Sequence, residues 1–91
     1  MTNWIETLKN GLKELDAKTE YANYCDKLFE ENPLDEEIEA KFDKAYEAEY
    51  NAFIHCINAL KHIIDIDDKT ARAMITTQRT QINNLLARWE A

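Results

Sequence analysis

The chain of 91 residues contains no serine and no valine, and it has a single glycine and a single proline. A protein without serine has no serine nucleophile, and one glycine cannot form a glycine-rich phosphate-binding loop. The lack of valine and the scarcity of turn formers disfavour a sheet, because strands are rich in β-branched residues and are separated by frequent Gly, Asn, Asp or Pro breaks. These absences exclude several enzyme classes and favour a helical protein.

Long apolar runs are also missing. No stretch approaches the ~20 apolar residues of a membrane span. The first residues lack the basic region and apolar run of a secretory signal. We therefore expect a cytoplasmic protein with no membrane contact, in which Cys25 and Cys56 are free thiols.

Apolar residues recur at helical spacing along the whole chain. In the first segment they follow one another at steps of three and four from Ile5 to Phe29, which predicts a helix from about Trp4 to about residue 31. Asn3 is the expected N-cap. The only glycine, Gly11, interrupts the composition but not the phase, so we predict one continuous helix.

Two further helices are expected after clear breaks. Asn32 is the predicted N-cap and Pro33 the first turn of a second helix that runs to about residue 65. Asp67 or Asp68 is predicted to cap a third helix of about 22 residues that begins near Lys69. Its apolar stripe is Ala71, Ile75, Gln78, Ile82, Leu85 and Trp89.

Short connections between helices favour antiparallel neighbours. The sequence therefore predicts an all-α fold, an up-down-up antiparallel three-helix bundle with two long helices and a shorter third, in which residues 1–91 form one domain. We expect the main core to contain Leu8, Leu12, Leu15, Phe53, Ile57, Leu60, Ile75, Ile82 and Leu85.

The unequal helix lengths predict a tip that the third helix leaves bare. If this helix climbs beside the second from the turn near Asp67, Ala91 lies level with about residue 43, and residues 24–43 form a two-helix tip. In this register Trp89 packs near Tyr21, Tyr24 and Tyr46, while Trp4 packs near Ile63 and Ile64. Cys25 and Cys56 are separated by an axial gap of roughly 20 Å, too far for an internal disulfide.

The negative charge is concentrated at the same tip. The formal net charge is −7, and residues 26–49, with ten acids and three bases, supply all of it. Apolar residues at the tip are poorly buried by two helices alone, so they are candidate interface anchors. The predicted partner-binding residues are Glu30, Glu31, Asp35, Glu36, Glu37, Glu39 and Asp43, with Phe29, Leu34, Ile38 and Phe42.

The acidic row supports more than one interpretation. A solvated, solubilising face is the simplest. A row of carboxylates on a rod also resembles a row of phosphates, and in composition the chain is similar to DNA mimics, a class that includes small acidic anti-restriction and anti-CRISPR proteins of phages and mobile elements. No motif assigns the chain to such a family. Direct binding of nucleic acid is disfavoured, because phosphates need Lys and Arg.

The histidines and the basic residues near the C-terminus give weaker indications of function. His55 and His62 are seven residues apart, about 10.5 Å along a helix, so they predict no metal site. Lys69, Arg72 and Arg79 belong to a segment without acids and are the candidate ligands of a small anion such as a nucleotide. No residue pattern predicts a cofactor or a catalytic group.

Taken together, these patterns favour a non-catalytic inhibitor or adaptor that engages a basic surface of a partner protein, such as a nucleic-acid-binding protein, through the tip. Two alternatives remain open. One is a self-associating structural module in which the tips of two chains pair into a homodimer. The other is a nucleotide-binding protein that uses the three basic residues of the last helix.

Overall fold

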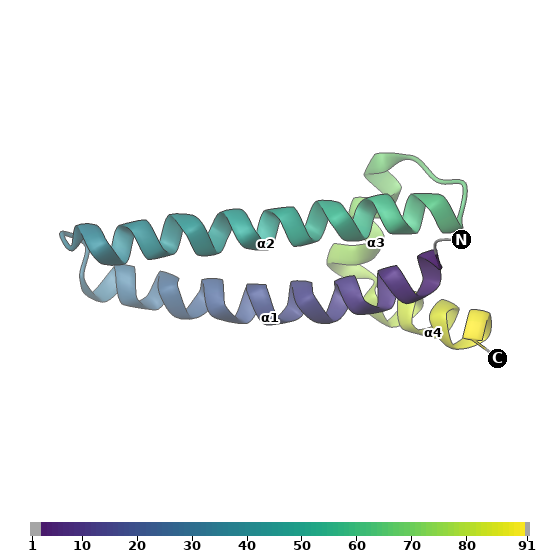
Figure 1. Cartoon of the computed structure of the whole chain (residues 1–91), viewed down its shortest axis with the longest axis horizontal. Coiled ribbons are helices and arrows are strands. Elements are labelled where there is room, and N and C mark those ends of the chain that lie inside the picture. Colours follow the sequence, from purple (N-terminus) through teal and green to yellow (C-terminus); the bar gives the residue numbers. More distant parts are fainter. Residues whose placement is uncertain (1–2, 91) are drawn as a thin grey trace.

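The computed structural model describes residues 3–90, which form four α-helices and no strand. Two helices of 28 residues each, α1 (Trp4–Glu31) and α2 (Glu36–Ile63), make a long antiparallel hairpin. Two shorter helices, α3 (Asp68–Thr77) and α4 (Arg79–Glu90), pack together on one end of it (Figure 1). The all-α class is confirmed, whereas the three-helix architecture is wrong. None of the helices in residues 3–90 is sufficiently long and apolar to cross a membrane.

The first helix runs through Gly11 without a break, as predicted. Asn3 caps it, since the Asn3 side chain accepts a hydrogen bond from the Glu6 backbone N–H at 3.1 Å. Gly11 is buried against α2, and a Cβ atom added there would lie 3.1 Å from the Sγ atom of Cys56. The glycine therefore serves the close approach of α1 and α2 rather than the end of a helix.

The turn between the long helices differs from the prediction. Asn32 ends α1, because its backbone N–H donates to two carbonyls of the last turn. The N-cap of α2 is Asp35, whose carboxylate accepts from two backbone N–H groups of the first turn at 3.0 and 3.3 Å. Asn and Asp are about equally good N-caps, and the negative charge of Asp35 is in addition favoured by the helix dipole. Pro33 consequently lies in the connection and not in the first turn of a helix.

The predicted single third helix is wrong, although its cap at Asp67 is confirmed by a hydrogen bond from the Thr70 N–H at 2.8 Å. The helix stops at Thr77, and Gln78 leaves helical geometry with φ −124° and ψ 42°. Two adjacent threonines precede the break, and β-branched residues are weak helix formers. The Thr77 hydroxyl donates to the carbonyl four residues earlier at 2.8 Å, a bond that often accompanies a bend.

This break redirects the end of the chain. Helix α3 packs on α2, and α4 crosses to α1 and runs back towards its start, where the Glu90 carboxylate lies 3.0 Å from Lys9 Nζ. Trp89 packs against the main core and not beside the three tyrosines named above, so that prediction is wrong. The predicted level of Ala91 lies outside the described residues. Trp4 packs in the same cluster as Ile63 and Ile64, as predicted.

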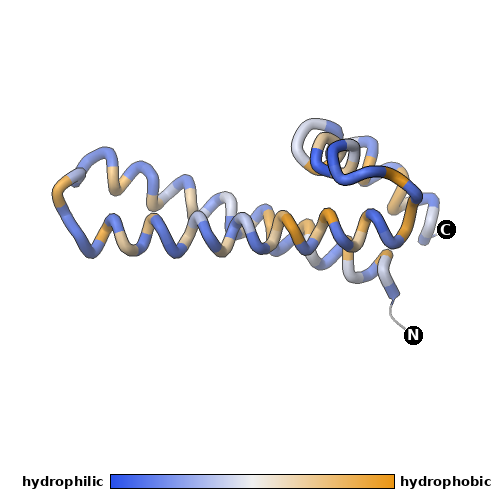
Figure 2. The backbone as a smooth tube through the Cα atoms, turned by 90° about the horizontal axis from the view of Figure 1, so that it is seen from above, coloured by the Kyte–Doolittle hydropathy of each residue, from blue (hydrophilic) through white to orange (hydrophobic). Residues whose placement is uncertain are grey.

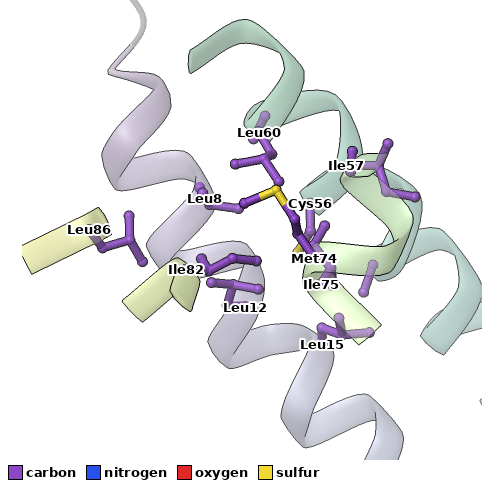
Figure 3. Packing of buried hydrophobic residues seen from close by; sticks show 13 residues of the cluster. Leu8, Leu12, Leu15, Cys56, Ile57, Leu60, Met74, Ile75, Ile82 and Leu86 are labelled. Carbon is purple, nitrogen blue, oxygen red and sulfur yellow. The ribbon is translucent and has the colours of Figure 1, made fainter. Parts of the chain in front are cut away.

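The main core lies where all four helices meet. Figure 3 shows leucine, isoleucine, methionine and cysteine side chains converging there from each helix. Seven of the nine predicted core residues are buried; Phe53 and Leu85 are only partly buried and pack around them. Leu86 takes the buried place predicted for Leu85, since the break at Gln78 shifts the helical phase. Both cysteines are free, as predicted, and the structure shows in addition that both are buried.

Candidate functional site: an acidic arm

The hairpin extends well beyond the region that α3 and α4 cover. We call residues 17–50 the arm, since none of them belongs to the main core. Figure 2 shows α3 and α4 on one side of the hairpin at one end, while the opposite half of the hairpin has no helix on any side. The arm makes up much of the 49 Å length of the molecule. It is longer than the predicted tip of residues 24–43, because α4 turns back instead of climbing beside α2.

All of the net charge of the protein lies in this arm. Residues 17–50 hold eleven acids and four bases, whereas the rest of the chain holds seven of each. The predicted carboxylates are all exposed: Glu30, Glu31, Asp35, Glu36, Glu37, Glu39 and Asp43. Asp35 differs from the others because its carboxylate also caps α2. We call the rest of the described chain, residues 3–16 and 51–90, the base of the molecule. The structure thus separates a base without net charge, which contains the main core, from a slender acidic arm.

A small second core holds the arm together. Ala22, Cys25 and Ala45 are buried between the two helices, with Phe42 packed beside them. The Phe29 and Phe42 rings stack across the helices with centroids 5.5 Å apart. Small side chains allow the helices to lie close together, but they remove little apolar surface from water. The arm consequently has few apolar contacts of its own.

The predicted apolar anchors fall into two groups. Leu34, in the connection, is 95% exposed. Phe29, Ile38 and Phe42 are half-buried, since they pack partly between α1 and α2. Only Leu34 is thus fully available to a partner, and the other three present one side each.

Tyrosines are the exposed residues that the sequence prediction missed. Tyr46 is 59% exposed and Tyr24 is 58% exposed, and Tyr21 and Tyr50 are similar. Tyr21, Tyr24 and Tyr46 were expected to pack near Trp89 at the upper end of a three-helix section. The break at Gln78 removes that cover. The only sequence signal for the break is the pair of threonines before it.

Three of the aromatic residues form a line on α2. Phe42, Tyr46 and Tyr50 are spaced four apart, so they share one face of the helix. The Phe42 and Tyr46 rings lie 5.9 Å apart. We call these three residues the aromatic stripe. The same residues, with Asp43 and Glu47, line a shallow surface groove along the arm.

The aromatic stripe ends at a cavity where the arm meets α3 and α4. This junction cavity, of about 330 Å³, is lined by side chains that include Leu15, Thr19, Tyr46, Tyr50, Phe53 and Arg79. Two of its lining residues are joined by hydrogen bonds: the Nη1 atom of Arg79 donates to both carboxylate oxygens of Asp16 at 2.8 and 2.9 Å. Asp16 and Glu49 also line the cavity, so it carries no excess positive charge.

Of the three alternative anion-binding residues, only Arg79 lines the junction cavity. Arg79 pairs with Asp16 as described, and Arg72 Nε donates to Asp68 at 2.6 Å while its guanidinium lies over the Phe53 ring at 5.8 Å. This hydrogen bond holds the pKa of the Asp68 carboxyl below its usual value. Lys69 is exposed at the start of α3 and does not line the junction cavity. Arg72 and Arg79 therefore each already have a carboxylate partner.

Histidine and carboxylate side chains show no metal-binding arrangement in the described part of the chain, where no three His, Cys, Asp or Glu residues form a suitable group. His62 stacks on Trp4 with ring centroids 4.0 Å apart and planes within 4°. His55 is exposed on α2. The His62 side chain therefore has a packing role beside Trp4 at the end of the main core.

Comparisons with known proteins identify no relative: no protein family, no curated protein and no solved structure matches the chain.

Proposed function

We propose that this protein acts as a non-catalytic binding protein, an inhibitor or adaptor whose arm engages a basic surface of a partner protein. One observation carries the proposal. The entire net charge of −7 lies on the part of the molecule that has the least apolar packing and the most exposed aromatic surface. Charged surfaces of this kind raise the rate of encounter with oppositely charged partners and fix their orientation.

A nucleic-acid-binding protein is the proposed kind of partner. Glu36, Glu39, Asp43 and Glu47 are spaced three or four apart along one rigid helix, so their carboxylates form a row. A cleft that binds phosphates with Lys and Arg attracts such a row by the same forces. The protein would then compete with nucleic acid for the cleft of its partner.

Self-association through the arms is the less favoured alternative. Two arms brought side by side would each contribute seven excess negative charges, which repel at ordinary ionic strength. We therefore expect a monomer in sedimentation experiments at low salt.

The test uses two triple variants with the same change in charge. The arm variant carries Glu36→Lys, Glu39→Lys and Asp43→Lys, and the control carries Glu6→Lys, Glu14→Lys and Asp65→Lys, which lie outside the arm. Each protein is immobilised and used to capture partners from the lysate of its native host. A partner that is captured by the parent and the control is then purified, and its association rate and its displacement from duplex DNA are measured.

We expect the arm variant to associate more slowly than the control at low salt, and we expect the difference to shrink at high salt, because rim charges act mainly on the association rate. Equal association rates of the two variants would contradict the proposed role of the arm charges. A captured partner that keeps its DNA when the parent protein binds would contradict competition with nucleic acid.

A further inference from the structure

We propose that the arm binds a basic amphipathic α-helix, which lies along the aromatic stripe as the third helix that this half of the hairpin lacks. The inference rests on the proposed function and names the shape and chemistry of the partner's surface. It is carried by the groove along Phe42, Tyr46 and Tyr50, by its continuity with the covered half, and by the charges beside it.

The groove continues the surface on which α3 already packs. Ile57, Phe53, Tyr50, Tyr46 and Phe42 follow one another on α2 at steps of three and four, so they share one face. At the base this face is covered, since Ile57 is fully buried in the core and Phe53 lies under the Arg72 guanidinium. Tyr46 and Tyr50 line both the junction cavity and the groove of the arm, so the two depressions adjoin. An apolar surface that a helix covers at the base is thus left open along the arm.

The length of the arm fits a helix, of which about two turns would lie against the aromatic stripe, since residues 42–50 extend over about 12 Å at ~1.5 Å per residue. The part of α1 that belongs to the arm, residues 17–31, is about 22 Å long at ~1.5 Å per residue. A partner helix of roughly 15 residues, or four turns, spans the same length. Such a helix places an apolar residue against the stripe at every third or fourth position, in the manner of helices that bind in a groove.

Carboxylates line the stripe on α2, and helical spacing places two more on the side of α1 that faces the junction cavity. On α2, Asp43 and Glu47 line the groove together with the aromatic residues. On α1, Asp26 and Glu30 share a face with Thr19, which lines the junction cavity. A bound helix with Lys or Arg beside its apolar stripe would meet carboxylates of both helices of the arm.

None of the residues that line the groove along the aromatic stripe is a lysine, although the arm contains four. Lys44 is two positions from both Phe42 and Tyr46, on the other side of α2. Lys18 lines a separate groove with Ala48 and Asn51, which shares no residue with the aromatic stripe. The charges of the stripe face therefore favour a cationic helix and disfavour an acidic one, including a second copy of this arm.

The binding test uses designed peptides as probes. The first is a fluorescein-labelled peptide of roughly 15 leucine and lysine residues, with leucine at steps of three and four so that it forms one apolar stripe. The second has the same composition with leucine distributed around the helix. The third has the pattern of the first with glutamate in place of lysine. Binding to the full-length protein is measured by fluorescence anisotropy, and helix formation by circular dichroism.

Two pairs of variants locate the site. Tyr46→Ala removes a member of the stripe, and Tyr24→Ala removes an equally exposed tyrosine of α1. Asp43→Lys changes a carboxylate beside the stripe, and Asp65→Lys makes the same change after the end of α2. All four residues are exposed, so the variants are expected to keep the fold, which circular dichroism and thermal unfolding check.

We expect the first peptide to bind about tenfold more tightly than the second, and the third not to bind. Tyr46→Ala should weaken its binding by about tenfold, as truncation of an aromatic anchor does, while Tyr24→Ala leaves it unchanged. Asp43→Lys should weaken binding more than Asp65→Lys, most strongly at low salt.

Equal binding of the two lysine peptides would overturn the inference, since the arm would then attract charge without selecting a helix. Equal effects of Tyr46→Ala and Tyr24→Ala would also overturn it. Tight binding of the third peptide would indicate an acidic partner or a second copy instead. None of these results depends on capture of the native partner. The helix inference can therefore fail while the proposed function stands, and the proposed function can fail in the capture experiment while the peptide results stand.

Discussion

Leucine side chains in this protein range from full burial to nearly full exposure. Leu60 lies in the main core with no exposed surface, while Leu34 projects from the connection and is 95% exposed. Periodicity placed Leu60 in the core correctly. The predicted N-cap at Asn32 put Leu34 in the first turn of the second helix, whereas it lies in the connection before α2. Burial of individual core residues was thus largely predictable from spacing.

Replacing these two leucines should have very different effects on stability. We expect Leu60→Ala to lower the free energy of unfolding by about 2–5 kcal/mol, because it removes buried methyl groups and leaves a cavity. Leu34→Ala should change it by less than ~0.5 kcal/mol. Chemical denaturation of both variants measures these values. A loss at Leu60 as small as that at Leu34 would show that the core is not packed there.

Burial also governs the chemistry of Cys56. Loss of hydration raises the pKa of its thiol to about 11, since the charged thiolate is poorly solvated in the core. The unfolded thiol ionises near its ordinary pKa of 9.0, so the folded state retains a proton that the unfolded state loses. The contribution of this thiol to stability is complete below pH 9 and is lost between about pH 9 and pH 11.

We therefore expect the free energy of unfolding to decline with pH above 9 less steeply in Cys56→Ala than in the parent protein. Denaturation at a series of pH values measures the two slopes. In the folded protein at neutral pH, Cys56 should also react slowly with thiol reagents and should become reactive on unfolding. Parallel pH profiles of parent and variant would contradict the assigned effect of burial.

At the level of helices, Gly11 shows how a local preference yields to packing. Glycine in a helix interior is less favourable than alanine by about 1 kcal/mol. Here the residue sits where an added Cβ would lie 3.1 Å from Cys56 Sγ and 3.4 Å from the His55 ring. Cys56 is fully buried, so its sulfur cannot move away without disturbing the core.

Gly11→Ala should consequently stabilise the protein by less than the ~1 kcal/mol expected from helix propensity, or destabilise it. The full gain should appear when Cys56→Ala is introduced first, because the sulfur in its way is gone. A double-mutant cycle measures this coupling, which we expect to be about 0.5 kcal/mol or more. The same gain in both backgrounds would mean that the close approach of α1 and α2 does not restrict this site.

For the molecule as a whole, the contrast between base and arm determines how stability is distributed. The base contains the contacts among four helices, while the arm has only two helices and a small core of short side chains. Regions with few buried apolar contacts open with low free energies. Backbone amides within residues 17–50 should therefore exchange with solvent faster than those of residues 53–63.

Hydrogen exchange measured by mass spectrometry or NMR tests this order. The first and last turns of each helix are left out of the comparison, since helix ends fray in any protein. Equal protection of the arm and the base would show that the arm is stabilised by interactions beyond its visible contacts.

The acidic row itself should destabilise the arm. Asp43 lies four residues after Glu39 and four before Glu47, so it repels both, and it lies beyond the first turn of α2, the turn in which the helix dipole would favour its charge. Asp43→Lys replaces two repulsions by two attractions, each pair being worth roughly 0.2–0.5 kcal/mol. We expect Asp43→Lys to raise the Tm at low salt, Asp43→Asn to raise it by less, and both effects to shrink at high salt. A lower Tm for Asp43→Lys would mean that this carboxylate stabilises the fold.

The sequence by itself determined the helical class, the two long helices, the continuity at Gly11 and most of the core. These properties depend on local spacing and on residue types that are present or absent. It also located the excess negative charge, which is a property of composition along the chain. The exposure of the predicted carboxylates was likewise predictable from residue type, because charged side chains remain in water unless a partner compensates for burial.

Only the tertiary structure decided where the C-terminal segment goes. The apolar stripe from Ala71 to Trp89 is consistent with one helix along α2, and its periodicity contains no information on what that helix would leave uncovered. The break at Gln78 lets Ile75 and Ile82 reach one core from two helices, with Arg79 paired to Asp16. Burial of apolar surface on both helices of the hairpin, α1 and α2, outweighs the interruption of the helix at Gln78. That long-range balance uncovers Tyr46 and Tyr50 and makes the arm longer than local patterns predict.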